Sequence, residues 1–277
     1  MKRTDKISKQ QAYSQLMASF SASRRNLLRG AAATGIAAVG AGALSALPAQ
    51  AAMIGHGEAM QHAKDMGLLS SSKATTDSIA TILTVARTAE QLAVTFYTNG
   101  INNADKLGIS GNNLDYLKAA LIEEQIHQQF FTANGGQSLA DTFSFPQGPS
   151  TFTDLNTFIA TQQQLEGVFD SAFLAAIFEF AQLGRPDLAQ IAGQIATIEA
   201  EHRALGRAIG NLNPADNWAF SPVLIASVGA APALVQKAGY LSPTSGNSYT
   251  YQQVSTNDSR ILYQKPFSVG STTVGNG

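Results

Sequence analysis

Apolar residues recur every three or four positions in four stretches of this chain, which is the spacing of an amphipathic helix. The first stretch includes Ile79, Ile82 and Leu83, and glycine, asparagine or proline interrupts the pattern at the end of each stretch. The four stretches span residues 73–100, 114–133, 153–183 and 187–209. The pattern therefore predicts an all-α domain of four helices.

The connections between the predicted helices differ in length. The first and third are short, whereas the middle one runs from Gln137 to about Thr153 and contains Pro146 and Pro149. Extended, this connection reaches about 56 Å, which is long enough to run back along a bundle. We therefore expect two helical hairpins joined by a long crossover, rather than a simple up-and-down bundle.

The same arrangement of charged residues occurs twice in the predicted helices. A glutamate is followed by a Glu-x-x-His 34 residues later in the first half and 33 residues later in the second half. Within a helix, Glu-x-x-His places a carboxylate and an imidazole on one face, one turn apart. Four such helices bring together four carboxylates and two imidazoles, the ligand set of di-iron and di-manganese bundles. The candidate metal ligands are Glu90, Glu124, His127, Glu166, Glu199 and His202.

The alternative interpretation is that these residues are ordinary solvated helix charges and hydrogen-bonded histidines. A single Glu-x-x-His would favour that alternative. Two matched copies favour a metal site, because carboxylates clustered in a core persist only where a cation neutralises them.

Other glutamates lie close to the motifs. Glu123 and Glu201 are expected to point away from the site by about 100° around their helices. Glu123 and His127 are also an i, i+4 pair, so the register of this helix stays open between Glu123 and Glu124. Glu179 lies on a different face of its helix, and we expect it to contact solvent or the C-terminal tail.

At these motifs the chain resembles the ferritin-like superfamily, and most of all the exported ferritin-like domain proteins grouped with the desiccation-related family. The resemblance spans about residues 79–205 and rests on Ala89-Glu90-Gln91-Leu92 with Phe96-Tyr97, Glu124-Gln125-Ile126-His127, Phe143-Ser144-Phe145-Pro146, Leu165-Glu166 with Ala172-Phe173-Leu174, and Ile198-Glu199-Ala200-Glu201-His202-Arg203.

The resemblance implies a ferritin-like four-helix bundle at residues 73–210 that holds two Fe or Mn ions. Glu124 and Glu199 would bridge the ions, and Glu90 and Glu166 would be terminal ligands. One departure from many relatives is Phe173, which stands where a tyrosine is common. No haem is expected, because no methionine follows Met66 to act as an axial ligand.

The first 51 residues have the pattern of an export signal rather than of a folded segment. Arg24-Arg25 precedes an apolar run rich in alanine and glycine, and Pro48-Ala49-Gln50-Ala51 forms a small-x-small cleavage site. The alternative is a membrane anchor, which the weak hydrophobicity of the run and the cleavage site disfavour. We therefore predict a twin-arginine signal at residues 1–51, the twin-arginine translocation machinery as a partner, and a periplasmic or extracellular location.

Removal of the signal changes the charge of the chain. Seven of its 18 basic residues and one of its 19 acidic residues lie within residues 1–51, so the remainder has a net charge of −7. This balance argues against nucleic acid as a partner, and no stable membrane anchor is expected. The chain has no cysteine, so no disulfide supports it.

The predicted helices are flanked by two further segments. A lead-in at residues 52–72 carries His56 and His62. The extension at residues 211–277 is rich in Gly, Pro, Ser and Asn, with a short helix expected at 224–238 and strands at 248–269. Three roles stay open for the extension: packing on the bundle, formation of a homo-oligomer, or partial mobility.

Two hypotheses for function follow. The first is an oxidoreductase in which the metal pair acts on O₂, H₂O₂ or Fe²⁺, by ferroxidase-like or catalase-like chemistry, in defence of the cell envelope against oxidative or metal stress. The second is a non-enzymatic, desiccation-type protective or structural protein, in which bound metal only stabilises the bundle.

Overall fold

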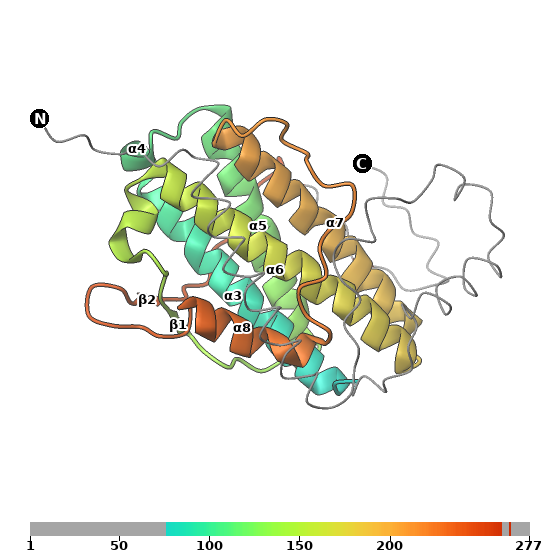
Figure 1. The fold of residues 1–277 in the computed structure, drawn as a ribbon. Coiled ribbons are helices and arrows are strands. Elements are labelled where there is room, and N and C mark those ends of the chain that lie inside the picture. The colour runs from blue at the N-terminus through green and yellow to red at the C-terminus, as the bar shows by residue number, and fades with distance from the viewer. Residues whose placement is uncertain (1–75, 262–265, 267–277) are drawn as a thin grey trace, which may run out of the picture. The chain divides into compact units, whose positions relative to one another are not determined.

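The structure is a computed structural model that describes residues 76–261 and Pro266. Its core is a bundle of four long helices that lie side by side (Figure 1). These are α3 (Ile79–Asn102), α5 (Asn112–Ala133), α6 (Leu155–Gln182) and α7 (Pro186–Ile209). The closest pairs are α3 with α5 and α6 with α7, and contacts of α3 with α6 and of α5 with α7 complete the bundle. The predicted all-α fold of two helical hairpins is therefore confirmed.

The helix ends follow from local capping. The Ser78 hydroxyl accepts a hydrogen bond from Thr81 N at 3.1 Å, so α3 begins at Ile79 rather than at the predicted residue 73. Asp154 caps α6 in the same way, accepting from Thr157 N at 2.8 Å, so α6 begins at Leu155 rather than at the predicted residue 153. A one-turn helix, α4 (Ala104–Leu107), lies in the first connection, where none was predicted.

The crossover between α5 and α6 runs along α3. It contains the strand β1 (Thr142–Phe143) and the 3₁₀ helix η3 (Gly148–Phe152). Its backbone is fixed to α3 by hydrogen bonds from Gln137 N to the Thr84 hydroxyl at 3.1 Å and from Leu139 N to the Thr88 hydroxyl at 3.0 Å. The crossover is therefore a packed layer of the domain.

An aromatic cluster joins the crossover to the bundle. Phe96 of α3 stacks on Phe158 of α6 with ring centroids 4.6 Å apart, and both rings contact Phe152. Phe145 packs edge-on against Phe152 and Tyr240, so the tail shares this core. Burial of these rings stabilises the end of the bundle on which the crossover packs.

The C-terminal extension packs on the bundle in its described part, but it is less regular than expected. The predicted helix at 224–238 is shortened to η4 (Val228–Ala230) and α8 (Ala231–Ala238). Before η4, the N–H groups of Leu224 and Ile225 donate to the Ser171 hydroxyl, which fixes this non-helical segment to α6. Of the strands predicted at 248–269, the described residues form only β2 (Tyr249–Thr250), which pairs antiparallel with β1. The pairing joins Thr142 to Thr250 and Phe143 to Tyr249.

Several predictions concern residues outside the described range. The signal at 1–51, the lead-in at 52–72, residues 73–75 of the first predicted helix, and residues 262–265 and 267–269 of the predicted strands are among them. Within the described part of the chain, none of the helices has the length and hydrophobicity that a membrane crossing needs.

Candidate metal centre

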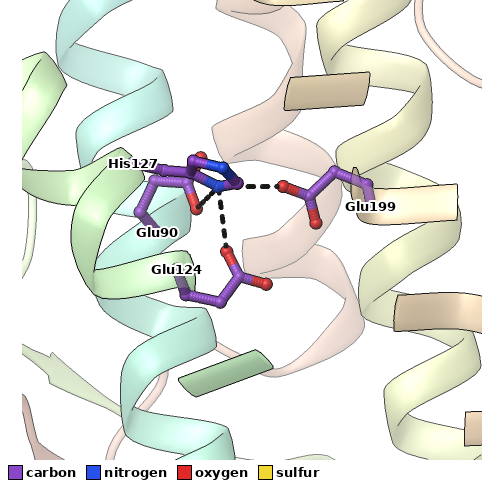
Figure 2. Close-up of side chains that lie close together, drawn as sticks. All are labelled: Glu90, Glu124, His127 and Glu199. Carbon is purple, nitrogen blue, oxygen red and sulfur yellow. Dashed lines mark ion pairs between the residues drawn. The ribbon is translucent and has the colours of Figure 1, made fainter. Parts of the chain in front are cut away.

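The six predicted ligands lie near the middle of the four long helices and meet in the interior of the bundle. Figure 2 shows Glu90 of α3, Glu124 of α5 and Glu199 of α7 around the imidazole of His127. The four glutamates are 0–1% exposed. Helical spacing explains the convergence, because Glu-x-x-His on α5 and on α7 turns both side chains of each pair to the same face.

The ligand atoms form two overlapping groups. The first consists of Glu90, Glu124, His127 and Glu199, and the second of Glu124, Glu166, Glu199 and His202. Within each group the donor atoms all lie within 4.8 Å of one another. Glu124 and Glu199 belong to both groups, so the arrangement has the form of two sites that share two carboxylates.

Each shared carboxylate turns one oxygen toward each histidine. Glu124 places Oε2 3.8 Å from Nδ1 of His127 and Oε1 3.1 Å from Nδ1 of His202. Glu199 places Oε1 3.5 Å from Nδ1 of His127 and Oε2 3.6 Å from Nδ1 of His202. Both carboxylates therefore lie between the two imidazoles, in the position that a bridging ligand requires.

The close packing of these groups shifts their pKa values. Burial raises the pKa of Glu90 and of Glu166 well above the usual range, and neighbouring carboxylates raise both further. Burial opposes the charged form of His127 and of His202, but the surrounding carboxylates outweigh it and raise the pKa of both imidazoles. Burial also opposes the charged form of Glu124, yet the adjacent Glu90, His127 and His202 outweigh it and lower its pKa. Without a cation, these shifts favour the protonated forms of two carboxyls and two imidazoles.

Many polar atoms of the cluster have no hydrogen-bond partner, although they are buried. They are Oε1 of Glu90, both carboxylate oxygens of Glu124 and of Glu199, Oε2 of Glu166, and Nδ1 of His127 and of His202. Leaving even one buried polar group unpaired costs about 1–3 kcal/mol. Eight such atoms, gathered in one buried cluster of carboxylates and imidazoles, could hold metal ions.

A hydrogen-bond network connects the residues on the α6 side of the site. The Tyr97 hydroxyl donates to Oε1 of Glu166, and the Gln162 amide donates to the Tyr97 oxygen at 3.1 Å and to the His202 carbonyl at 2.7 Å. Gln162 reaches that carbonyl because Gly206 leaves room; a Cβ at Gly206 would lie 2.1 Å from Oε1 of Gln162. The sequence places Tyr97 two turns after Glu90, but its contact with Glu166 was not predicted.

Glu123 has a role that the sequence analysis missed. It was expected to point away from the site, but its Oε2 lies 2.8 Å from Nε2 of His202. A carboxylate at Nε2 holds the proton there and leaves Nδ1 of His202 free to face the shared carboxylates. The structure thus decides between Glu123 and Glu124 on this helix. Glu124 belongs to the cluster, and Glu123 lies outside it and contacts Nε2 of His202.

Glu179, Phe173 and Trp218 lie outside the cluster. Glu179 is buried and accepts hydrogen bonds from Asp77 N at 2.8 Å and Val228 N at 2.9 Å, so the expected tail contact is present and the expected solvent contact is not. Phe173 is buried against Phe131. Trp218 lies beneath the Arg203 guanidinium, which is 3.2 Å from the ring centroid.

Comparison with known proteins agrees with this geometry. Residues 78–211 match the family model of the ferritin-like domain, a range that contains the four long helices and all six clustered residues. No curated protein and no solved structure matched the chain. From residue 78 to residue 211, the chain is therefore similar to the ferritin-like domain family.

Proposed function

We propose that the domain binds two Fe or Mn ions through Glu90, Glu124, His127, Glu166, Glu199 and His202, and that it acts as an oxidoreductase on O₂, H₂O₂ or Fe²⁺. The observation that carries the proposal is the set of eight buried donor atoms without hydrogen-bond partners, arranged as two groups that share Glu124 and Glu199. When bound, such ions supply one-electron redox chemistry and a positive charge that neutralises the carboxylates.

The residues of the chain have distinct roles in this proposal. Glu124 and Glu199 hold the two groups at a fixed separation, because each spans both histidines. Glu123 fixes the tautomer of His202. Tyr97 orients Glu166 by its hydrogen bond. The buried position excludes bulk water, which strengthens each of these interactions.

We further propose that the chain is exported and serves in defence of the cell envelope against oxidative or metal stress. Support comes from the sequence alone: Arg24-Arg25 before an apolar run, the cleavage pattern at Pro48-Ala49-Gln50-Ala51, and the acidic charge of the remainder. The twin-arginine translocation machinery is the partner that this proposal requires.

A second candidate function is a protective bundle without turnover, of the desiccation-related kind. The direction of the pKa shifts favours it: the pKa values of Glu90, Glu166, His127 and His202 are raised, so protons would reduce the charge repulsion in the cluster without any ion. In that case the cluster would contribute to the stability of the fold and would not catalyse a reaction.

Metal content and substrate consumption distinguish the two functions. The full chain is purified without added metal, its metal content is measured, and the consumption of H₂O₂, O₂ and Fe²⁺ is followed. Two Fe or Mn ions per chain, lost together with activity in Glu124→Ala/Glu199→Ala, is the expected result. Glu201→Ala is the matched control, because Glu201 is an exposed glutamate on the same helix. The proposed oxidoreductase activity would be refuted if the protein holds no metal, or if the activity survives the double substitution.

A further inference from the structure

A pocket of about 390 Å³ lies against the candidate metal centre between α5 and α7. Its size is within the range of about 300–1,000 Å³ that is usual for small-molecule sites. The residues that α5 contributes are Glu123, Ile126, His127 and Phe130, and those of α7 include Ile191, Gln194, Ile195 and Ile198. Each set follows the i, i+3, i+4, i+7 spacing of one helix face, so two neighbouring faces form most of the lining, and Thr197, Ile261 and Pro266 complete it.

The pocket is lined by one histidine of the centre and by a residue that contacts the other histidine. His127 lines it directly, and the same imidazole approaches Oε1 of Glu199 at 3.5 Å through Nδ1. Glu123 also lines it and contacts Nε2 of His202 at 2.8 Å. The His127 side chain is 12% exposed, whereas that of His202 is 1% exposed. The pocket therefore gives access to the centre from the side of His127.

The chemistry of the walls selects a class of ligand. Isoleucine side chains and the Phe130 ring favour an apolar, preferably aromatic, body. Oε1 of Gln194 is buried and has no hydrogen-bond partner, so it is an acceptor that a ligand donor would satisfy. The Glu123 carboxylate disfavours an anion in this apolar space.

We propose that this pocket binds a small, uncharged phenol-type molecule, with its ring between α5 and α7 and its hydroxyl donating to Oε1 of Gln194. Its place beside a metal pair rests on the proposed function, whereas binding to the pocket does not. The dinuclear centre would then act next to an organic co-substrate, and not only on O₂, H₂O₂ or Fe²⁺.

The test uses 4-fluorophenol and ¹⁹F NMR with the full chain, first free of metal. Saturable binding is expected in the wild type. Ile198→Trp, which fills the pocket, should abolish it, and Gln194→Leu, which removes the acceptor, should weaken it about fivefold. Val223→Trp is the control for an added tryptophan, because Val223 is 56% exposed and lies outside the pocket. Thermal unfolding of each variant shows whether it is folded, and Gln194→Leu keeps the test decisive if Ile198→Trp does not fold.

A negatively charged probe of similar size tests whether the pocket prefers an uncharged ligand. In the metal-free chain, 4-fluorobenzoate should bind much more weakly than 4-fluorophenol, because its carboxylate would be buried beside Glu123. Equal binding of the two probes would overturn the assignment to an uncharged ligand. If binding of 4-fluorophenol is not saturable, or is unchanged in both pocket variants, the proposal that this pocket binds a phenol is wrong.

Loading with Mn²⁺ separates this inference from the proposed function. Paramagnetic relaxation of the bound ¹⁹F nucleus by Mn²⁺ is expected in the wild type and should vanish in Glu199→Ala while 4-fluorophenol still binds. If the protein holds Mn²⁺ and binds the probe without this relaxation, the placement beside the centre is wrong. If no Mn²⁺ binds but the pocket variants still lose the probe, the proposed dinuclear function fails and the phenol site stands.

Discussion

Substitution of a shared carboxylate should remove both metal ions, whereas substitution of a terminal one should remove a single ion. Glu124 and Glu199 occur in both groups of donor atoms, while Glu90 occurs only in the group with His127. Glu124→Gln therefore takes one donor from each group. Glu90→Gln leaves all four members of the other group in place. Glutamine has the shape of glutamate, so packing is nearly conserved and the loss of charge is isolated.

The expected effect on stability follows from mass action. An ion present at 100 times its dissociation constant stabilises the folded state by about 2.7 kcal/mol, so two independent ions contribute about 5 kcal/mol. For a domain of this size, each kcal/mol shifts the melting temperature by about 2–4 °C, which gives a shift of about 10–20 °C for the wild type. Glu90→Gln should retain about half of that shift, and Glu124→Gln should retain almost none.

Equilibrium dialysis against Mn²⁺ gives the number of bound ions, and thermal unfolding with and without Mn²⁺ gives the shift. Expected occupancies are two ions in the wild type, one in Glu90→Gln and none in Glu124→Gln. Glu201→Gln, on an exposed position of α7, should behave as the wild type. Equal losses in Glu90→Gln and Glu124→Gln, or one ion retained in Glu124→Gln, would refute the assignment of Glu124 as a shared ligand.

Three further predictions concern protons and packing. Metal binding should release protons, because the pKa values of two carboxyls and two imidazoles in the cluster are raised, and apparent affinity should therefore increase with pH. Calorimetry in buffers of different ionisation enthalpy measures this release, and its absence would contradict the pKa shifts. Burial, and next the charge of Glu199, raises the pKa of Asp170 to about 6, above its unfolded value near 3.8. The unfolded chain then binds fewer protons between about pH 4 and 6, so Asp170 reduces stability as pH rises through that window. Asp170→Asn should stabilise the metal-free protein at pH 8 by about 2 kcal/mol in denaturant unfolding, and no gain over the wild type would count against a raised pKa. Glu179→Ala leaves Asp77 N and Val228 N without their acceptor and should destabilise the fold by about 2–3 kcal/mol in the same assay, whereas a change below about 0.5 kcal/mol would show that these bonds contribute little.

The helices and the candidate ligands were accessible from the sequence because both depend on local spacing. The recurrence of apolar residues every three or four positions locates the ends of each helix of the bundle to within two residues, except for the start of the first, which was predicted six residues too early. Asp154 before the third helix and Gly135-Gly136 after the second mark ends that the structure confirms. The i, i+3 spacing within Glu-x-x-His fixes two donors on one face, so the duplicated motif predicts the cluster without any knowledge of how the helices cross.

Contacts between distant segments were decided only by the tertiary structure. Glu123 reaches His202 and Tyr97 reaches Glu166 across 79 and 69 residues, and no local pattern specifies either pair. Pairing of β1 with β2 and the shortened helix α8 likewise depend on where the tail lies. Local periodicity sets which face of a helix is apolar or charged, but the separation and rotation of packed helices set which side chains on neighbouring faces meet. The pocket beside His127 has the same origin. Helical spacing identifies each of its two faces in the sequence, but the faces enclose a space only once α5 and α7 are packed.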